Sequence, residues 1–331
     1  MQPERSVIEA LLRPHSVAIV GMSSKPKTAG HMVLGNLTLN HFAGDIHLVG
    51  RSGGTIENRP LLTSVDQLPE NIDLAVFTLP ASSVQEAIEA CGRRKVRAAV
   101  VFAAGFAEMG ERSAQDKLIS AARAGGVAVL GPNCLGYTNY IDAIQFGFTN
   151  ASVVEKADTR RDPATAIISQ SGGLMSHLSR GLQARDLPVS YMVSTGNEAV
   201  LGVADFIDFI IDDVNTRSII AYIEEGRQPQ RLLASLSRAR DAGKPVIVMH
   251  PGRSARAHTA LTSHTGALAG DHAIMRTLIS HAGAIVVDTM DELIDVAELV
   301  ARYPKLPVKG PGVITFSGAL VAIAHDFCEA E

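Results

Sequence analysis

The chain has 331 residues, of which 46% are hydrophobic, so it is longer than one typical domain and can bury two cores. Its formal charge is −4, with 30 basic and 34 acidic residues and no basic stripe that would favour nucleic acid. No apolar run reaches the roughly 18 residues that span a bilayer, and residues 1–5 lack the pattern of a secretion signal. We therefore expect a cytoplasmic protein with neither a nucleic-acid nor a membrane partner.

Strand-like and helical runs alternate along the chain, which predicts an α/β fold with parallel sheets. The predicted strands of the first half cover residues 17–20, 46–49, 74–78, 99–102 and 127–130, with helices between them such as 82–91 and 113–124. Residues 151–163 are polar and aperiodic, which predicts a linker.

A second alternating unit follows the linker. Its predicted strands cover residues 166–169, 190–193, 219–223, 246–249 and 284–287, and its predicted helices cover 174–184, 203–211, 230–242, 272–281 and 291–303. The chain then continues with a predicted strand at 312–315 and a helix at 320–329. One strand and one helix cannot bury a core alone, so we expect them to begin a third domain of a larger protein.

The first predicted strand ends in a turn that contains Gly21 and Lys25. Backbone N–H groups at a strand-to-helix crossing bind phosphate, because the start of a helix is locally positive. The spacing lacks the G-x-G-x-x-G pattern of ordinary dinucleotide folds. Arg51, after the second strand, replaces the acidic residue that holds the ribose of NAD, and an arginine suits the ribose phosphate of either NADP or coenzyme A.

Two further strand ends carry candidate site residues. The sequence Ser-Gln-Ser-Gly-Gly at 169–173 follows a strand and opens a helix, so its amides and hydroxyls favour an oxyanion, although a simple helix cap has the same pattern. Glu224 ends the strand at 219–223, and a carboxylate there can fix the tautomer of a nearby imidazole.

His264 lies within Ser-His-Thr-Gly-Ala-Leu-Ala-Gly at residues 263–270, where small neighbours leave the imidazole unobstructed. The glycines, serines and proline of residues 250–270 favour turns over helix or strand, so we expect a mobile loop. A histidine on such a loop can accept a phosphoryl group at one place and deliver it at another. Of the other histidines, His258 has no glycine clearance, His250 could contact phosphate or nothing, and two on a predicted helix, His272 and His281, pack or face solvent by default.

These motifs resemble those of the NDP-forming acyl-CoA synthetases, the superfamily of succinyl-CoA synthetase and ADP-forming acetyl-CoA synthetase. Residues 263–270 resemble its phosphohistidine loop, and residues 252–254 and 286–293 fit the acetyl-CoA synthetase branch. The motifs at 131–136 and 169–173 occur in the family in the same order. The likeness covers nearly the whole chain.

The resemblance implies a Rossmann-like CoA-binding domain at 1–150, a flavodoxin-like phosphohistidine domain at 151–305 and the start of a third α/β domain at 306–331. It implies coenzyme A contacts at Gly21, Ser23, Ser24, Lys25, Arg51, Pro80, Ala104 and Gly105. Many relatives place the basic residue after Val-Asn-Pro, so Arg51 is shifted by one position. Phosphate contacts are implied at Ser169, Ser171, Gly172 and Gly173, and acyl or phosphate positioning at Asn133, with Asn197 lining the acyl pocket.

The implied reaction joins a carboxylic acid to coenzyme A with ATP, through a phosphohistidine on His264 that Glu224 supports; Glu225 departs from the glycine usual in relatives. ATP or ADP with Mg²⁺ is expected on an ATP-grasp domain or subunit outside this chain, in an oligomer. The motifs do not identify the acid. Two alternatives stay open, an acyl-CoA-sensing module of an acetyltransferase with a silent histidine, and an NADP oxidoreductase, which the second alternating unit opposes.

The three cysteines, Cys91, Cys134 and Cys328, have no metal-ligand spacing and cannot all pair within one chain. We predict no metal site. Cys134 could be interpreted as a nucleophile. We favour the interpretation that it is a small, half-buried thiol between Gly131 and Gly136.

Overall fold

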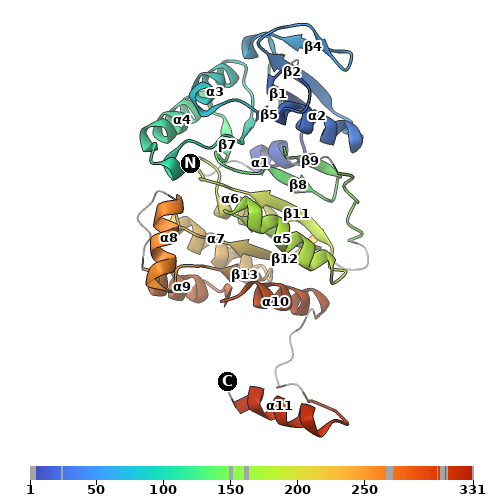
Figure 1. Cartoon of the computed structure of the whole chain (residues 1–331), viewed down its shortest axis with the longest axis vertical. Coiled ribbons are helices and arrows are strands. Elements are labelled where there is room, and N and C mark those ends of the chain that lie inside the picture. Colours follow the sequence, from blue (N-terminus) through green and yellow to red (C-terminus); the bar gives the residue numbers. More distant parts are fainter. Residues whose placement is uncertain are drawn as a thin grey trace.

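The computed structural model describes residues 5–23, 25–148, 152–159, 164–265, 271–303, 305, 310 and 312–329; the side chains of residues 5, 6, 258 and 262–265 lie outside this description. Two α/β domains lie one above the other, and the last helix, α11 (Gly318–Glu329), stands apart from both (Figure 1). Among the helices of the described ranges, none is both long enough and apolar enough to cross a membrane.

The first domain is built on a sheet whose strands, in the described residues, run in the order β3-β4-β2-β1-β5-β6-β7. All of its pairings are parallel except that of β3 with β4. The strands are β1 (Ser16–Met22), β2 (Asp45–Gly50), β3 (Thr55–Ile56), β4 (Arg59–Leu62), β5 (Leu74–Phe77), β6 (Ala98–Val101) and β7 (Ala128–Leu130). The helices are α1 (Arg5–Leu12), α2 (Ala29–Leu39), α3 (Val84–Arg93) and α4 (Arg112–Gly125), with short 3-10 turns η1 (Val65–Gln67), η2 (Ala81–Ser83) and η3 (Ala107–Met109).

The second domain has a sheet of order β14-β13-β12-β10-β11-β8-β9 within the described residues. Its strands are β8 (Tyr137–Asn139), β9 (Ile144–Phe146), β10 (Ala164–Ser169), β11 (Val189–Ser194), β12 (Thr216–Tyr222), β13 (Val246–Met249) and β14 (Ile285–Val287). Its helices are α5 (Gly172–Gln183), α6 (Val203–Ile211), α7 (Pro229–Asp241), α8 (Ala255–Thr265), α9 (His272–His281) and α10 (Met290–Arg302).

The predicted α/β class and the predicted strands of both units are confirmed. Strands such as β5, β6 and β10 are buried along their whole length, as continuous apolar runs in a parallel sheet between helices must be. The β8–β9 hairpin pairs with β11 and so belongs to the second sheet, although the predicted CoA-binding domain extends to residue 150.

The two domains share one hydrophobic core at the hairpin. Tyr137 and Phe146 are buried there, with ring centroids 5.3 Å apart. The Tyr137 hydroxyl donates to the carbonyl of Leu11, and the Asn139 amide donates to that of Leu12 at 3.1 Å. Apolar burial and hydrogen bonds therefore fix the second sheet against α1 of the first domain.

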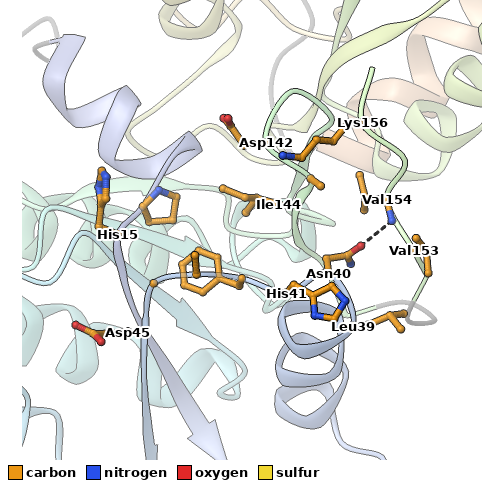
Figure 2. Close-up of a pocket in the computed structure, with 15 residues that line it drawn as sticks. His15, Leu39, Asn40, His41, Asp45, Asp142, Ile144, Val153, Val154 and Lys156 are labelled. Carbon is orange, nitrogen blue, oxygen red and sulfur yellow. Dashed lines mark hydrogen bonds between the residues drawn. The ribbon is translucent and has the colours of Figure 1, made fainter. Parts of the chain in front are cut away.

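The predicted linker has no regular structure over its described residues, 152–159. The side-chain oxygen of Asn40, just after α2, accepts the N–H of Val154 at 2.7 Å (Figure 2). The linker and the end of α2 enclose a cavity of about 850 Å³ that also reaches His15 and Asp142. This cavity lies at the amino ends of β1 and β2.

The predicted strand at 312–315 is wrong, because these residues form neither helix nor strand. A strand needs a neighbour for its backbone groups, and Ile314 and Phe316 are fully exposed, at 101% and 108% of the reference surface. The helix predicted for 320–329 is confirmed as α11.

Candidate functional site

The carboxyl ends of the first sheet bring the predicted coenzyme A contacts to one edge. Val20 pairs with Val49 and with Phe77, and Phe77 pairs with Val101, so the chain leaves four neighbouring strands at one level. The segments that follow contain Gly21, Arg51, Pro80, Ala104 and Gly105. Ligands of open α/β sheets bind at this kind of edge. Ser24 lies outside the described residues.

Gly21 is where the end of β1 closely approaches the residue that follows β5. Its φ is +104°, and an added Cβ would lie 2.8 Å from the Thr78 hydroxyl and 2.9 Å from the Thr78 backbone. Only glycine suits both the conformation and the space. Lys25 and Arg51 are exposed beside this turn, and the Ser23 hydroxyl accepts the N–H of Lys25 at 3.1 Å. The edge thus offers backbone amides and cationic side chains.

Glu108, in η3, is a residue that the sequence analysis missed. Its carboxylate accepts the N–H of Gly105 at 2.5 Å and that of Phe106 at 3.2 Å, and it also accepts from the Asn197 amide. Burial opposes ionisation, but these hydrogen bonds outweigh it and lower the pKa of Glu108. Glu108 therefore ties the Gly105 turn of the first domain to the second domain.

The two predicted substrate residues lie together at this domain junction. The Asn133 amide donates to the side-chain oxygen of Asn197 at 3.2 Å, and the Asn197 amide also donates to Gln115 at 3.1 Å. The backbone N–H of Asn197 donates to the carbonyl of Pro132 at 2.9 Å. The carboxyl end of β7 thus meets the carboxyl end of β11, and the two candidate edges share a junction.

The second sheet aligns its strand ends in the same way. Ser169 pairs with Ser194 and with Tyr222, and Tyr222 pairs with Met249. Consequently the Ser169–Gly173 loop, Glu224 and the segment leading into α8 leave adjacent strands at one level. This is the arrangement that the sequence predicted for a phosphoryl site.

The Ser169–Gly173 loop is held by its own hydroxyls. Ser169 donates to the carbonyl of Ser171 at 2.6 Å and accepts the N–H of Ser171 at 3.1 Å. Ser171 is the N-cap of α5 and accepts the N–H of Leu174 at 3.5 Å. Apart from its own helix, no described residue comes within 4 Å of the Cβ that could be built on Gly173, so the start of α5 is open on that side in the described structure.

Glu224 is half-buried directly after β12, and its backbone N–H donates to the side-chain oxygen of Gln170 at 2.6 Å. It borders a cavity of about 270 Å³, which His250, His272 and Leu261 of α8 also line. Glu224 therefore lies beneath the helix that carries position 264.

The expected loop at 250–270 is wrong for residues 255–265, which form α8. Alanines and a leucine favour helix over the first turns, and the Ser254 hydroxyl accepts the N–H of Ala257 at 3.2 Å, as an N-cap does. Position 264 falls in the last turn of α8, while the His264 side chain and residues 266–270 lie outside the described part of the chain. Helix α8 contacts η3 of the first domain, which places it across the junction (Figure 1).

His250 and His272 form a stacked pair, with ring centroids 5.0 Å apart and planes 6° from parallel. A carbonyl can only accept, so His250 donates from Nδ1 to Ile223 at 2.7 Å, and His272 donates from Nε2 to the His250 carbonyl at 3.0 Å. Burial lowers the pKa of His250. Both rings are therefore part of the packing beneath α8.

Cys134 is more buried than the half-buried thiol we expected, with 3% of its surface exposed. Its thiol donates to the carbonyl of Val101 at 3.4 Å, and burial raises its pKa to about 12. A thiol that stays protonated is a poor nucleophile. Cys134 therefore acts as a packing residue between the two domains.

Comparisons with known proteins match both domains. The family described as succinyl-CoA ligase like flavodoxin domain matches residues 163–300, and the CoA binding domain family matches residues 15–140. The chain is 39% identical over 324 residues to a trans-feruloyl-CoA synthase, FCS1, of an unknown prokaryotic organism, covering 97% of this chain and 46% of that protein. It is 33% identical over 332 residues to the alpha subunit of acetate–CoA ligase (ADP-forming) I from Pyrococcus furiosus, covering 98% and 70% respectively.

A solved structure with the same architecture is acetyl-coenzyme A synthetase 1 of Candidatus Korarchaeum cryptofilum in complex with phosphate and ADP. It has a TM-score of 0.80 and 29% identity, over 89% of this chain and 62% of that one. The fold and its paired edges define a CoA-ligase core, with a Rossmann-like CoA-binding domain followed by a flavodoxin-like domain. The chain belongs to the family of ADP-forming acyl-CoA ligases, and it spans about half the length of the trans-feruloyl-CoA synthase that it matches.

Proposed function

We propose that this chain is the part of an ADP-forming acyl-CoA ligase that binds coenzyme A and carries the phosphorylated histidine. The complete reaction converts a carboxylic acid, ATP and coenzyme A into acyl-CoA, ADP and phosphate. The observation that supports it most is the common edge of the second sheet. There the Ser169–Gly173 loop, Glu224 and the segment that leads into α8 leave adjacent strands, beside the carboxyl end of the first sheet.

The reaction divides into three displacements. An imidazole nitrogen of His264 attacks the terminal phosphorus of ATP, forming a P–N bond as ADP leaves. A carboxylate oxygen of the acid then attacks that phosphorus, so the P–N bond breaks and an acyl phosphate forms. Finally the sulfur of coenzyme A, having lost its proton, attacks the carbonyl carbon, and phosphate leaves. Storing the phosphoryl group on nitrogen allows ATP and coenzyme A to bind at separate places.

The residues of the two edges have distinct roles in this scheme. Lys25 and Arg51 attract the phosphates of coenzyme A, whose chain passes over the turns at Gly21 and Gly105. The amides that open α5, at Gly172 and Gly173, stabilise the transferred phosphoryl group. Asn133 positions the carboxyl group at the junction, and Asn197, which accepts from the Asn133 amide, lines the acyl pocket there.

Glu224 accepts a hydrogen bond from the imidazole nitrogen of His264 that does not react. That bond fixes the tautomer and stabilises the cationic phosphoimidazole. ATP and Mg²⁺ bind on an ATP-grasp part beyond this chain, either the remainder of one long protein or a partner subunit in an oligomer. Helix α8 then carries position 264 between the two places.

The experiment that tests this function combines the chain with its ATP-grasp part and supplies ATP, Mg²⁺, coenzyme A and one acid at a time. Acetate, 4-hydroxybutyrate and ferulate are the first choices, since ligases named for these acids are relatives. We expect thioester, ADP and phosphate in equal amounts with at least one acid. Formation of AMP and pyrophosphate would contradict the proposal, and so would coenzyme A binding without any turnover, which would favour an acyl-CoA-sensing module.

A further inference from the structure

A partly buried cluster behind the carboxyl end of β12 has no role in the scheme above. It consists of Gln170, Thr195 and Glu198, with Gln170 between the two serines of the phosphate loop. We infer that Gln170 is a positioning residue that sets the direction of Glu224 toward the histidine. This inference rests on the proposed function, because it concerns the step in which Glu224 supports the phosphorylated imidazole.

Both the oxygen and the nitrogen of the Gln170 carboxamide hydrogen-bond to the backbone that follows β12. Its oxygen accepts the N–H of Glu224 at 2.6 Å and that of Glu225 at 2.9 Å, and its nitrogen donates to the carbonyl of Glu225 at 2.8 Å. A backbone N–H can only donate and a carbonyl can only accept, so this orientation of the amide is the one the contacts require. Three bonds from one planar group fix the backbone that carries the Glu224 side chain.

The same residue fastens the phosphate loop to that backbone. The backbone N–H of Gln170 donates to the carbonyl of Tyr222 at 3.1 Å, while Ser169 and Ser171 hold the loop on either side. A shift of the loop at the start of α5 therefore shifts the turn at Glu224 with it. Gln170 keeps the group that would bind phosphate and the group that would orient the imidazole in one fixed relation.

Glu198 lies beside Gln170, whose amide favours the ionised form of the Glu198 carboxyl and so opposes the rise of its pKa. One oxygen of Glu198 accepts from the Thr195 hydroxyl at 2.9 Å and from the N–H of Val203 at 3.2 Å. Gly202 packs so closely that an added Cβ would lie 2.6 Å from the other oxygen. The Gln170 amide thus rests against a side chain that itself has no room to turn.

The surroundings of Glu198 allow both its protonated and its ionised form near neutral pH. Burial raises its pKa to about 7, although its hydrogen bonds and the positive charge of Arg227 oppose that rise. The neighbouring charges are paired, Arg227 with Glu225 at 3.3 Å and Arg231 with Asp205. A substitution at Gln170 that changes the pKa of Glu198 therefore changes the pH dependence of the site.

Two substitutions separate positioning from simple packing. Gln170→Met keeps the length of the side chain and removes all of its hydrogen bonds. Gln170→Glu keeps the two acceptor bonds to the N–H groups of Glu224 and Glu225, loses the donor to the Glu225 carbonyl and faces Glu198 with a second carboxyl. Gln183→Met, on the exposed end of α5, is the matched control.

The measurement is the single-turnover rate of histidine phosphorylation from ATP in the complete enzyme, from pH 6 to pH 8, with coenzyme A affinity measured in parallel. We expect Gln170→Met to slow phosphorylation by about 100-fold, the scale of a misplaced catalytic group, with coenzyme A affinity unchanged. Glu224→Gln added to Gln170→Met should slow it further by much less than it slows the wild type. Gln170→Glu should regain rate as the pH falls, because a protonated carboxyl can again donate to the Glu225 carbonyl.

Wild-type phosphorylation rates in Gln170→Met, alongside a strong loss in Glu224→Gln, would overturn the positioning role. A Gln170→Glu variant whose pH profile runs parallel to the wild type would also overturn it, and this arm holds even where Gln170→Met does not fold. Failure of the proposed function looks different, since the wild-type enzyme itself would then take no phosphate on histidine.

Discussion

The two sheet edges that meet at the junction differ in the groups that form them. The edge of the first sheet relies on backbone turns, such as that at Gly21, and on exposed cations such as Lys25 and Arg51. The edge of the second sheet relies on partly buried side chains, above all Gln170 and Glu198, that hydrogen-bond to the backbone. A long flexible ligand with several phosphates suits the first edge, whereas a covalent transfer that needs fixed angles suits the second.

The largest effect should come from disrupting the close backbone contact at Gly136, just before β8. Its φ is +81°, and an added Cβ would lie 1.8 Å from the carbonyl oxygen of Phe146. Gly136→Ala should therefore destabilise the protein by about 3 kcal/mol or more. Thermal or denaturant unfolding measures this.

The matched control is Gly110→Ala, whose φ of +86° is nearly the same but whose added Cβ meets nothing within 4 Å among the described residues beyond its chain neighbours. It should cost only the backbone strain, on the order of 1 kcal/mol. Equal losses for the two variants would show that the junction tolerates the added methyl group.

At the second edge, the Glu198 carboxyl should make the stability of the folded protein depend on pH. Because the folded pKa of Glu198 is raised to about 7, the folded protein binds more protons than the unfolded chain between that value and the ordinary glutamate pKa of 4.5. Wild-type stability should therefore fall through this window as pH rises, by at most about 1.4 kcal/mol per pH unit from this group. Glu198→Gln should remove that fall, so the stability of the variant relative to wild type rises with pH.

Denaturant titrations at several pH values measure the difference in unfolding free energy between Glu198→Gln and the wild type. Parallel curves for Glu198→Gln and wild type from pH 4.5 to 7 would mean that Glu198 is ionised in the folded state like an exposed carboxylate.

Substitutions at the first edge should weaken coenzyme A binding and leave the stability of the protein unchanged. Lys25→Ala and Arg51→Ala should each weaken coenzyme A binding by about tenfold, the loss of one charge-assisted hydrogen bond, without a change in melting temperature. Lys117→Ala, an exposed lysine on α4 away from the edge, is the control. Calorimetric titration with coenzyme A and with NADP decides the outcome; unchanged coenzyme A affinity in both variants would remove these cations from the site.

The smallest effect concerns the thiols. Burial raises the pKa of Cys91 and of Cys134 to about 12, whereas Cys328 is exposed on α11. Iodoacetamide at pH 8 should modify Cys328 alone in the native protein and leave phosphorylation unchanged. Modification of native Cys134, detected by peptide mass, would contradict its packing role.

The same contrast explains what the sequence could predict. Strands and their glycine turns, such as that at Gly21, are local patterns, so most strands of the two sheets were predicted correctly, while β3, β4 and the β8–β9 hairpin were not. Glu108 and Asn197 meet across 89 positions of the chain, and Gln170 and Glu224 across 54, so no local pattern marks their contacts. Gln170 lay inside a predicted motif, but the motif pointed to the hydroxyls and amides around it and not to its side chain.

Two predictions failed for opposite reasons. Glycines, serines and a proline predicted a loop over residues 250–270, but the alanines after the Ser254 cap form helix α8. Apolar residues at 312–315 predicted a strand, but no neighbouring strand pairs with them in the described structure. Local composition gave too little weight to helix propensity in the first case and too much weight to hydrophobicity in the second.

The phosphorylation of His264 tests the central claim most directly. The chain with its ATP-grasp part is incubated with ATP labelled at the terminal phosphate, and the label is located by peptide mass and by its stability to acid and base. We predict a label that acid removes and base does not, at His264, absent from His264→Asn and reduced in Glu224→Gln. A label that persists in His264→Asn, or a wild-type enzyme that makes acyl-CoA without phosphorylating histidine, would contradict the account.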